Sequence, residues 1–222
     1  MEKLNNKREL IFFPLLTIPF IYIGYVWTEL PDRIAIHFNL HGIANGWSGK
    51  WGIFIIPCVN IAIYLLILFL PLIDPKRMNA DNFTAMFYKI RILIVTFMFF
   101  MSLLAIDSAV KGSMSESISH WIPVGVFLFL SVFGNFMINI KPNWFIGIRT
   151  PWTLSSDTVW RRTHQVMGRT WFYGGLLCAA LSCLTPDHWT ERLIIAFAAG
   201  TALFAFVYSF WLYKKEKTGT AV

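Results

Sequence analysis

The stretch WGIFIIPCVNIAIYLLILFLPLI, Trp51–Ile73, decides the class of fold because it runs for 23 residues without a charged side chain. About 20 apolar residues in a helix are enough to cross the hydrocarbon core of a bilayer. A backbone in lipid must satisfy its own hydrogen bonds, and a helix does so within one segment. We therefore predict that this stretch is a membrane-spanning helix.

Further apolar stretches lie on both sides of it. They are Leu10–Trp27, Ile90–Val110, Trp121–Ile138, Trp171–Leu184 and Leu193–Leu212. The chain is 56% hydrophobic and 14% charged, whereas about a quarter of the residues in soluble domains are charged. No linker or repeat separates the stretches. We expect an all-α polytopic membrane protein with about six transmembrane helices, which form a single transmembrane bundle over residues 1–222.

The distribution of Lys and Arg predicts the orientation of these helices, since short cytoplasmic loops carry an excess of positive charge. With a cytoplasmic N-terminus, the basic residues outside the cell are Arg33, Lys50, Lys111 and Arg192. The other fifteen lie inside: Lys3, Lys7, Arg8, Lys76, Arg77, Lys89, Arg91, Lys141, Arg149, Arg161, Arg162, Arg169, Lys214, Lys215 and Lys217. Both termini are therefore expected in the cytoplasm. The net charge of +7 reflects this topology, so direct nucleic acid binding is not expected.

Residues 29–50 form the longer of the expected outer loops. The segment RIAIHFN alternates apolar and polar residues, which predicts a short half-buried strand, and HG and NGW are turn signals. One interpretation is a binding face built on His37 and Asn39 and braced by Trp47 and Trp51. The other is an interfacial loop, since tryptophan favours the headgroup region. Composition alone favours the interfacial loop.

The histidines also raise the question of a metal. His37 and His41 have the i, i+4 spacing that would place two imidazoles on one helical face, and zinc at His37, His41, His120 and His188 is the alternative. The extended pattern of the loop and the lack of an HExxH motif argue against it. We expect no cofactor.

Residues 139–170 form the expected inner loop. Pro142 ends the preceding helix, Gly147 permits a turn, and Thr150 precedes a proline and avoids helical geometry. Ser155 or Ser156 can cap an amphipathic helix from about Asp157 to Met167, which we expect to lie in the membrane interface between helices four and five. Its arginines either anchor the loop on anionic lipid or dock a cytoplasmic partner. Composition alone favours the lipid anchor.

Both loops resemble known bacterial sequences. The outer LPDRIAIHFNLHGIANGWSGK is similar to a bacterial domain with an L-P, an H-F-N-x-x-G and a G-W signature. The inner PNWFIGIRTPWTLSSDTVWRRTHQVMG resembles the SdpI family, in which P-N-x-x-x-G-I-R-T-P-W-T-L leads to W-x-x-T-H and a glycine. The matching outer residues are His37, Phe38, Asn39, Gly42 and Trp47. The matching inner residues are Asn135, Pro142, Asn143, Gly147, Arg149, Thr150, Pro151, Trp152, Thr153, Leu154, Trp160, Thr163, His164 and Gly168.

The resemblance implies an immunity and signal-transduction protein of the bacterial cytoplasmic membrane. Such a protein protects against a secreted amphipathic killing peptide on the outer side and recruits a transcriptional repressor on the inner side. To the family residues we add Arg161 and Arg162 as candidates for partner contact, because they lie on the predicted inner helix.

Two other functions are alternatives. A membrane peptidase or hydrolase would use His37 with Asp32 or Glu29, or His164 with Asp157 and Thr163. The sequence lacks GxSxG and HExxH motifs, so a non-enzyme is expected. A peptide exporter would need charged or broken helices near the membrane midplane, and no inverted repeat is evident.

Overall fold

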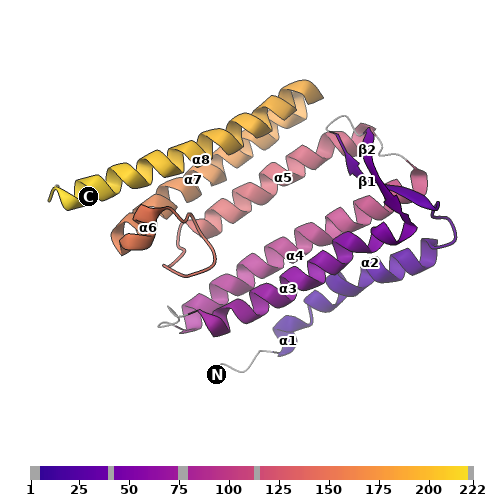
Figure 1. The fold of residues 1–222 in the computed structure, drawn as a ribbon, viewed down its shortest axis with the longest axis horizontal. Coiled ribbons are helices and arrows are strands. Elements are labelled where there is room, and N and C mark those ends of the chain that lie inside the picture. The colour runs from indigo at the N-terminus through magenta and orange to yellow at the C-terminus, as the bar shows by residue number, and fades with distance from the viewer. Residues whose placement is uncertain (1–5, 40–42, 75–79, 113–115, 220–222) are drawn as a thin grey trace. The chain divides into compact units, whose positions relative to one another are not determined.

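The computed structural model describes residues 6–39, 43–74, 80–112 and 116–219, and most of these are helical (Figure 1). A single antiparallel hairpin of two strands interrupts the helices in this described part of the chain. The elements are α1 (Asn6–Glu9), α2 (Phe12–Val26), β1 (Arg33–Phe38), β2 (Ala44–Gly49), the 3-10 helix η1 (Lys50–Phe54), α3 (Ile55–Ile73), α4 (Ala80–Lys111), α5 (Glu116–Met137), α6 (Pro151–Ser155), α7 (Asp157–Leu184) and α8 (Asp187–Lys217).

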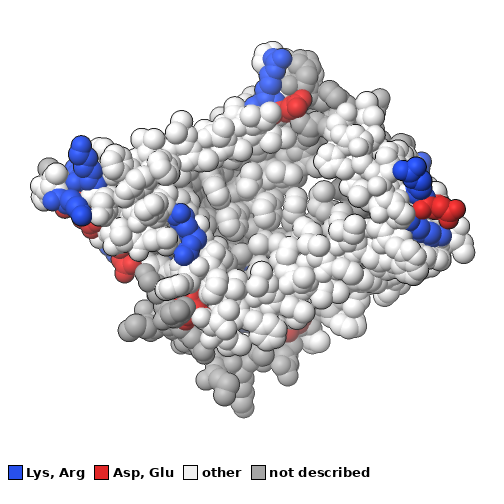
Figure 2. All heavy atoms as spheres, viewed as in Figure 1, with Lys and Arg blue, Asp and Glu red and all other residues white. Residues whose placement is uncertain are grey.

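Four helical stretches among the described residues are long and apolar enough to cross a membrane. They are Lys50–Ile73, Ala85–Lys111, His120–Met137 and Trp189–Lys217. The helix α2 is also apolar but shorter. On the face shown in Figure 2, charged side chains gather near the ends of elements and the surface between them is uncharged. The protein is therefore a multi-pass membrane protein, as composition predicted.

The amphipathic helix expected in the membrane interface is not a separate element. Residues 157–167 and the apolar stretch that begins at Trp171 form one continuous helix, α7. Nothing between Met167 and Trp171 breaks the helix, because Gly168 keeps helical geometry. Val159, Trp160, Thr163, His164 and Met167 are buried, so one face of this part of α7 packs into the protein.

The contacts divide the chain into two compact units. Unit 1 contains residues 1–69 and 87–122, and unit 2 contains residues 70–86 and 123–222. Both α3 and α4 contribute residues to each unit. The single bundle over residues 1–222 stays a prediction.

The core of unit 1 attaches the hairpin to the helices. Ile34 of β1 and Ile53 of η1 are buried in one cluster with Ile23 of α2 and Ile106 of α4. The cluster forms because the apolar ends of α2 and α4 meet the buried side of the hairpin.

Unit 1 also contains a buried ion pair. Arg91 of α4 is only 5% exposed and pairs with Glu9, which also accepts a hydrogen bond from the Tyr64 hydroxyl at 2.9 Å. The rings of Phe12, Tyr64 and Tyr88 surround the guanidinium, with centroids 4.8, 5.1 and 5.7 Å away. A buried charge in a membrane helix is costly without such partners. The pair therefore holds the start of the chain against α3 and α4.

In unit 2, glycines bring α5 and α7 into close contact. A Cβ atom at Gly168 would lie 2.7 Å from the carbonyl oxygen of Gly134, and one at Gly175 would lie 2.8 Å from that of Phe127. The Ser131 hydroxyl donates to the carbonyl of Phe172 at 2.9 Å. Small residues allow this approach of two helices, as is usual in membrane proteins.

Candidate functional site

The hairpin confirms the predicted strand but not its alternation. Ile34 of β1 pairs with Ser48 and Ala35 pairs with Trp47, while the register shifts between Ala35 and His37. As a result Ile34 and Ala35 are both buried, and Ile36 is 47% exposed. A bulge bends a strand and redirects its side chains, which the period-two pattern could not anticipate.

The predicted binding residues His37 and Asn39 close the hairpin. The His37 Nδ1 atom is hydrogen bonded to the Asn45 side-chain oxygen. The Asn39 Oδ1 atom accepts from the Ile43 amide at 2.9 Å, and the Asn39 amide donates to the Ile43 carbonyl at 2.9 Å. Asn45 and Gly46 were expected to form a turn but belong to β2.

The hairpin and η1 expose large apolar side chains, which we call the hairpin patch: Ile36, Trp47 and Trp51. Trp47 is 50% exposed and Trp51 is 73% exposed. The Trp51 ring packs on Trp27 with centroids 5.0 Å apart, and the Lys50 ammonium lies 4.5 Å from the Trp27 centroid. Phe38 is half-buried. Gly42 and His41 lie outside the described residues.

The described residues contain no group of three or more His, Cys, Asp or Glu side chains that could bind a metal. The described residues exclude His41 and the side chain of His188. The alternative of a zinc site at His37, His41, His120 and His188 is therefore not tested in full. The exposed His37 bonds to Asn45.

The inner motif folds into a loop between α5 and α7 that includes α6, here called the motif loop (residues 138–156). Asn143 lies at its centre and is 2% exposed. Its Oδ1 atom accepts from the Phe145 and Ile146 amides at 2.8 and 2.6 Å. Its Nδ2 atom donates to the Lys141 and Ile146 carbonyls at 3.0 and 2.7 Å. The backbone from Lys141 to Ile146 thus turns around the Asn143 side-chain amide.

Replacing Asn143 by aspartate should therefore destabilise the motif loop more than replacing it by alanine. A carboxylate keeps the two accepted bonds but faces two carbonyls without a donor, and a buried charge without compensation is costly. We expect trypsin to cleave after Arg149 in Asn143→Asp under conditions that leave the wild type intact. Equal resistance of wild type, Asn143→Ala and Asn143→Asp would contradict this role.

His164 and Trp160 of α7 hold the second half of the motif loop. His164 is 0% exposed; its Nε2 accepts from the Ile148 amide at 2.8 Å, and its Nδ1 donates to the Trp160 carbonyl at 2.8 Å. The Trp160 indole donates to the Ile140 carbonyl at 3.0 Å, and the two rings stack with centroids 4.1 Å apart. With both nitrogens bonded to backbone, His164 is a structural residue that substrate cannot reach.

Burial lowers the pKa of His164 from 6.5 to about 4, against the opposing effect of its bond to the Trp160 carbonyl. The residue precedes the apolar stretch that begins at Trp171. Because the folded-state pKa is depressed, its contribution to stability is complete above pH 6.5 and decreases as the pH falls toward 4. The loss approaches about 3 kcal/mol, since each pKa unit corresponds to about 1.4 kcal/mol.

The apparent unfolding temperature in detergent should therefore fall more between pH 7 and pH 4.5 in the wild type than in His164→Gln. Glutamine offers a donor and an acceptor but does not titrate. Parallel pH profiles for the two proteins would show that another group causes the acid sensitivity.

The segment Thr150–Thr153 attaches the motif loop to α8. Thr150 has extended geometry, as its position before Pro151 predicted, and it caps α6 together with Thr153. The Thr150 hydroxyl donates to Ser209 at 3.0 Å, and the Thr153 hydroxyl donates to the Ile148 carbonyl at 2.8 Å. The Trp152 ring packs on Phe206 and Phe210 of α8.

Sequence reasoning missed Asp74, which follows α3 and is buried. Its Oδ2 atom accepts from the Trp144 amide at 2.9 Å. In the sequence, Asp74 is only an acidic residue between a long apolar stretch and Pro75. That pattern does not indicate which group the carboxylate would bond to. Asp74 anchors the turn that Asn143 organises.

The remaining predicted residues differ in exposure. Arg149, Arg161 and Arg162 are exposed, and the Arg149 Nη1 atom donates to the Asn143 carbonyl at 3.0 Å. Thr163 is fully buried. Asn135, Pro151 and Leu154 are exposed, and Pro142 is half-buried. The buried polar side chains Asn143, Thr150, Thr153 and His164 therefore shape the loop, whereas the three arginines remain accessible.

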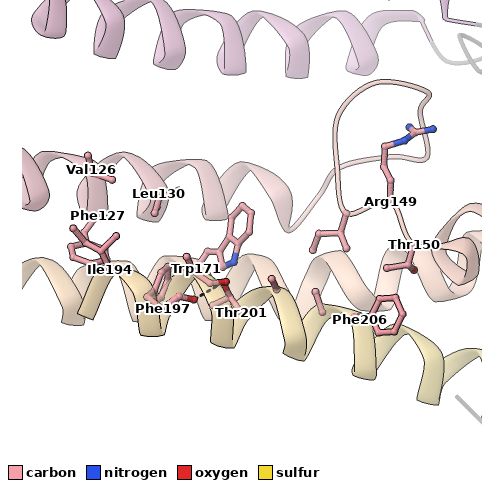
Figure 3. A pocket seen from close by; sticks show the side chains of 14 residues that line it. Val126, Phe127, Leu130, Arg149, Thr150, Trp171, Ile194, Phe197, Thr201 and Phe206 are labelled. Carbon is pink, nitrogen blue, oxygen red and sulfur yellow. Dashed lines mark hydrogen bonds between the residues drawn. The ribbon is translucent and has the colours of Figure 1, made fainter. Parts of the chain in front are cut away.

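Unit 2 contains an elongated pocket of about 450 Å³ between α5, α8 and the motif loop (Figure 3). Val126, Phe127 and Ile194 line one end, and Arg149, Thr150 and Phe206 line the other. Trp171 and Thr201 lie between the two ends, and the lining is otherwise apolar.

Comparisons with known proteins agree with both resemblances. Residues 7–61 match the model of a domain of unknown function (DUF1648), and this match covers the hairpin. Residues 139–209 match the model of the SdpI/YfhL protein family, and this match covers the motif loop, α7 and most of α8. No curated protein and no solved structure matches the chain. Residues 139–209 of this multi-pass membrane protein therefore identify a segment of the SdpI/YfhL family.

Proposed function

We propose that the protein is an immunity and signal-transduction protein of the bacterial cytoplasmic membrane. The hairpin patch binds a secreted amphipathic killing peptide on the outer side. The exposed arginines of α7 contact a cytoplasmic repressor on the inner side. A peptide can change that contact only if it binds one packing of the helices more tightly than another.

The order of the elements supports two functional surfaces on opposite sides. The hairpin precedes α3 and the motif loop follows α5, and α3, α4 and α5 each include a stretch that can cross a membrane. With each of these helices taken as one crossing, the hairpin and the motif loop would lie on opposite sides of the membrane. The excess of Lys and Arg near the motif loop favours the cytoplasm for that side.

The observation that carries the peptide-binding role is the exposure of Ile36, Trp47 and Trp51 next to Lys50. Aromatic side chains supply most of the energy in many interfaces. An amphipathic peptide would bury its apolar side on this patch. The motif loop, by contrast, satisfies its polar groups internally, while the neighbouring Arg161 and Arg162 are exposed.

A survival assay tests the outer role. A susceptible bacterium that expresses the wild type should tolerate more of a secreted amphipathic killing peptide than cells without the protein. Removing the Trp47 contact in Trp47→Ser should lower the tolerated peptide concentration about tenfold, which corresponds to the loss of about 1.4 kcal/mol of apolar burial. The matched control is Trp189→Ser, a similarly exposed tryptophan at the start of α8.

Equal tolerance in wild type and Trp47→Ser, with both proteins at the same level in the membrane, would reject the hairpin patch as the peptide site. For the inner role, the double change Arg161→Glu and Arg162→Glu should remove the peptide-dependent expression of the genes that the repressor controls, while survival is kept. Arg169→Glu, on the same helix, is the control. Arg149 is a poorer choice because it also holds the Asn143 carbonyl.

A further inference from the structure

The pocket of unit 2 takes no part in the proposed function and has the shape of a ligand site. Its volume of about 450 Å³ falls within the range of roughly 300–1,000 Å³ usual for small-molecule pockets. Its lining residues on α8 extend from Ile194 to Phe206, which is about 18 Å at 1.5 Å per residue. The pocket is therefore long enough for a chain and too apolar for a soluble metabolite.

The room for a ligand comes from small side chains on α8. Ala198, Thr201, Ala202 and Ala205 recur at close to helical spacing and line the pocket, whereas Phe197 and Phe206 close it beside them. Residues three and four apart share one helical face. α8 thus presents a shallow hollow toward α5 and the motif loop.

The pocket wall contains an unused hydrogen-bond donor. The indole Nε1 atom of Trp171 is buried, and it has no hydrogen-bond partner among the described residues. Figure 3 shows this ring on the side of α7 that faces α5, with its nitrogen on the side of Thr201, and the ring stacks on Phe133 of α5 with centroids 5.9 Å apart. The Thr201 hydroxyl donates to the Phe197 carbonyl at 2.7 Å. A buried N–H without an acceptor is costly, so a ligand with an acceptor at this depth would be favoured.

We propose that the pocket binds one acyl chain of an anionic glycerophospholipid, whose ester carbonyl accepts from the Trp171 indole. The walls α5 and α8 include candidate membrane spans, so the surrounding medium supplies hydrocarbon chains. The chain would extend toward Val126 and Ile194. The headgroup would lie near Arg149, at the end where α8 continues to Lys214, Lys215 and Lys217, because basic residues attract anionic lipid.

A photoactivatable phosphatidylglycerol with a diazirine in one acyl chain tests the proposal on the full-length protein. The protein is reconstituted in nanodiscs of phosphatidylglycerol and phosphatidylethanolamine, irradiated and analysed by peptide mass spectrometry. Labelling should concentrate on the pocket segments of α5 and α8. Ala202→Phe fills the hollow and should reduce this labelling at least fivefold. Ala199→Phe, exposed on the same helix but outside the pocket lining, should not.

Competition then tests the donor. Unlabelled diester phosphatidylglycerol should displace the probe about fivefold better than its diether analogue, which lacks the carbonyl and hence one net hydrogen bond. In Trp171→Phe this preference should vanish while labelling of the pocket persists. Labelling that is spread evenly over the exposed apolar side chains, or that is equal in Ala202→Phe and Ala199→Phe, would overturn the site. Equal displacement of the probe by the diester and the diether lipid in the wild type would overturn the assignment of Trp171 as the hydrogen-bond donor.

Discussion

Replacing Gly147 by alanine is expected to unfold the motif loop while the rest of unit 2 stays helical. Gly147 has φ +136°, a conformation that costs about 1–3 kcal/mol for a residue with a side chain. Its Cβ atom would also lie 2.6 Å from the His164 Nε2 atom and 2.8 Å from the Trp160 ring. Both rings are buried and cannot move aside. We expect the free energy of unfolding to fall by several kcal/mol. A lower unfolding temperature and trypsin cleavage after Arg149 would measure this loss.

Gly200→Ala is the matched control for this change. Gly200 lies inside α8, where an added methyl group would have no atom within 4 Å, and alanine favours helix by about 1 kcal/mol over glycine. This variant should be as stable as the wild type or more so. A Gly147→Ala protein with the unfolding temperature and trypsin resistance of the wild type would refute the assigned role of the loop geometry.

Replacing Gly168 by leucine is expected to separate α7 from α5. A Cβ atom at this position would lie 2.7 Å from the Gly134 carbonyl oxygen and 2.8 Å from the Ile138 amide nitrogen. These are backbone atoms, so the conflict can be relieved only if one helix moves. That movement would also break the bond from Ser131 to the Phe172 carbonyl. Overpacking of this kind costs about 1–3 kcal/mol or more.

The measurements are the yield of monodisperse protein in detergent and its unfolding temperature. Gly168→Ala should lose part of the stability and Gly168→Leu most of it. Gly125→Ala on α5, where nothing lies within 4 Å, should change neither quantity appreciably. If Gly168→Leu behaves like Gly125→Ala, the close contact between α5 and α7 does not contribute to the stability of unit 2.

Features that depend on neighbouring residues were predictable. Hydrophobicity accumulates along a segment, so the apolar stretches at α3, α4, α5 and α8 were found before any packing was known. The strand β1 and the extended Thr150 before Pro151 follow from local backbone preferences. The same holds for the Ser156 side chain, which accepts from the Val159 amide at the start of α7.

Features that depend on distant residues were not predictable. Local pattern suggested an interfacial helix at residues 157–167, but its burial against the motif loop appears only when α5 and α7 pack. The partner strand β2 and the bulge that exposes Ile36 depend on pairing. Asp74 and Arg91 find partners 70 and 82 residues away.

The sequence by itself determined that this is a helical membrane protein and which segment carries the family motif, since transfer from water to lipid and backbone preferences act residue by residue. Only the tertiary structure decided what the motif residues do. Asn143 and His164 resemble binding residues in the sequence, yet their polar atoms are directed at the backbone around them. Which groups satisfy a buried hydrogen bond is settled by packing, because a buried donor or acceptor must be paired with whatever atom the fold brings next to it.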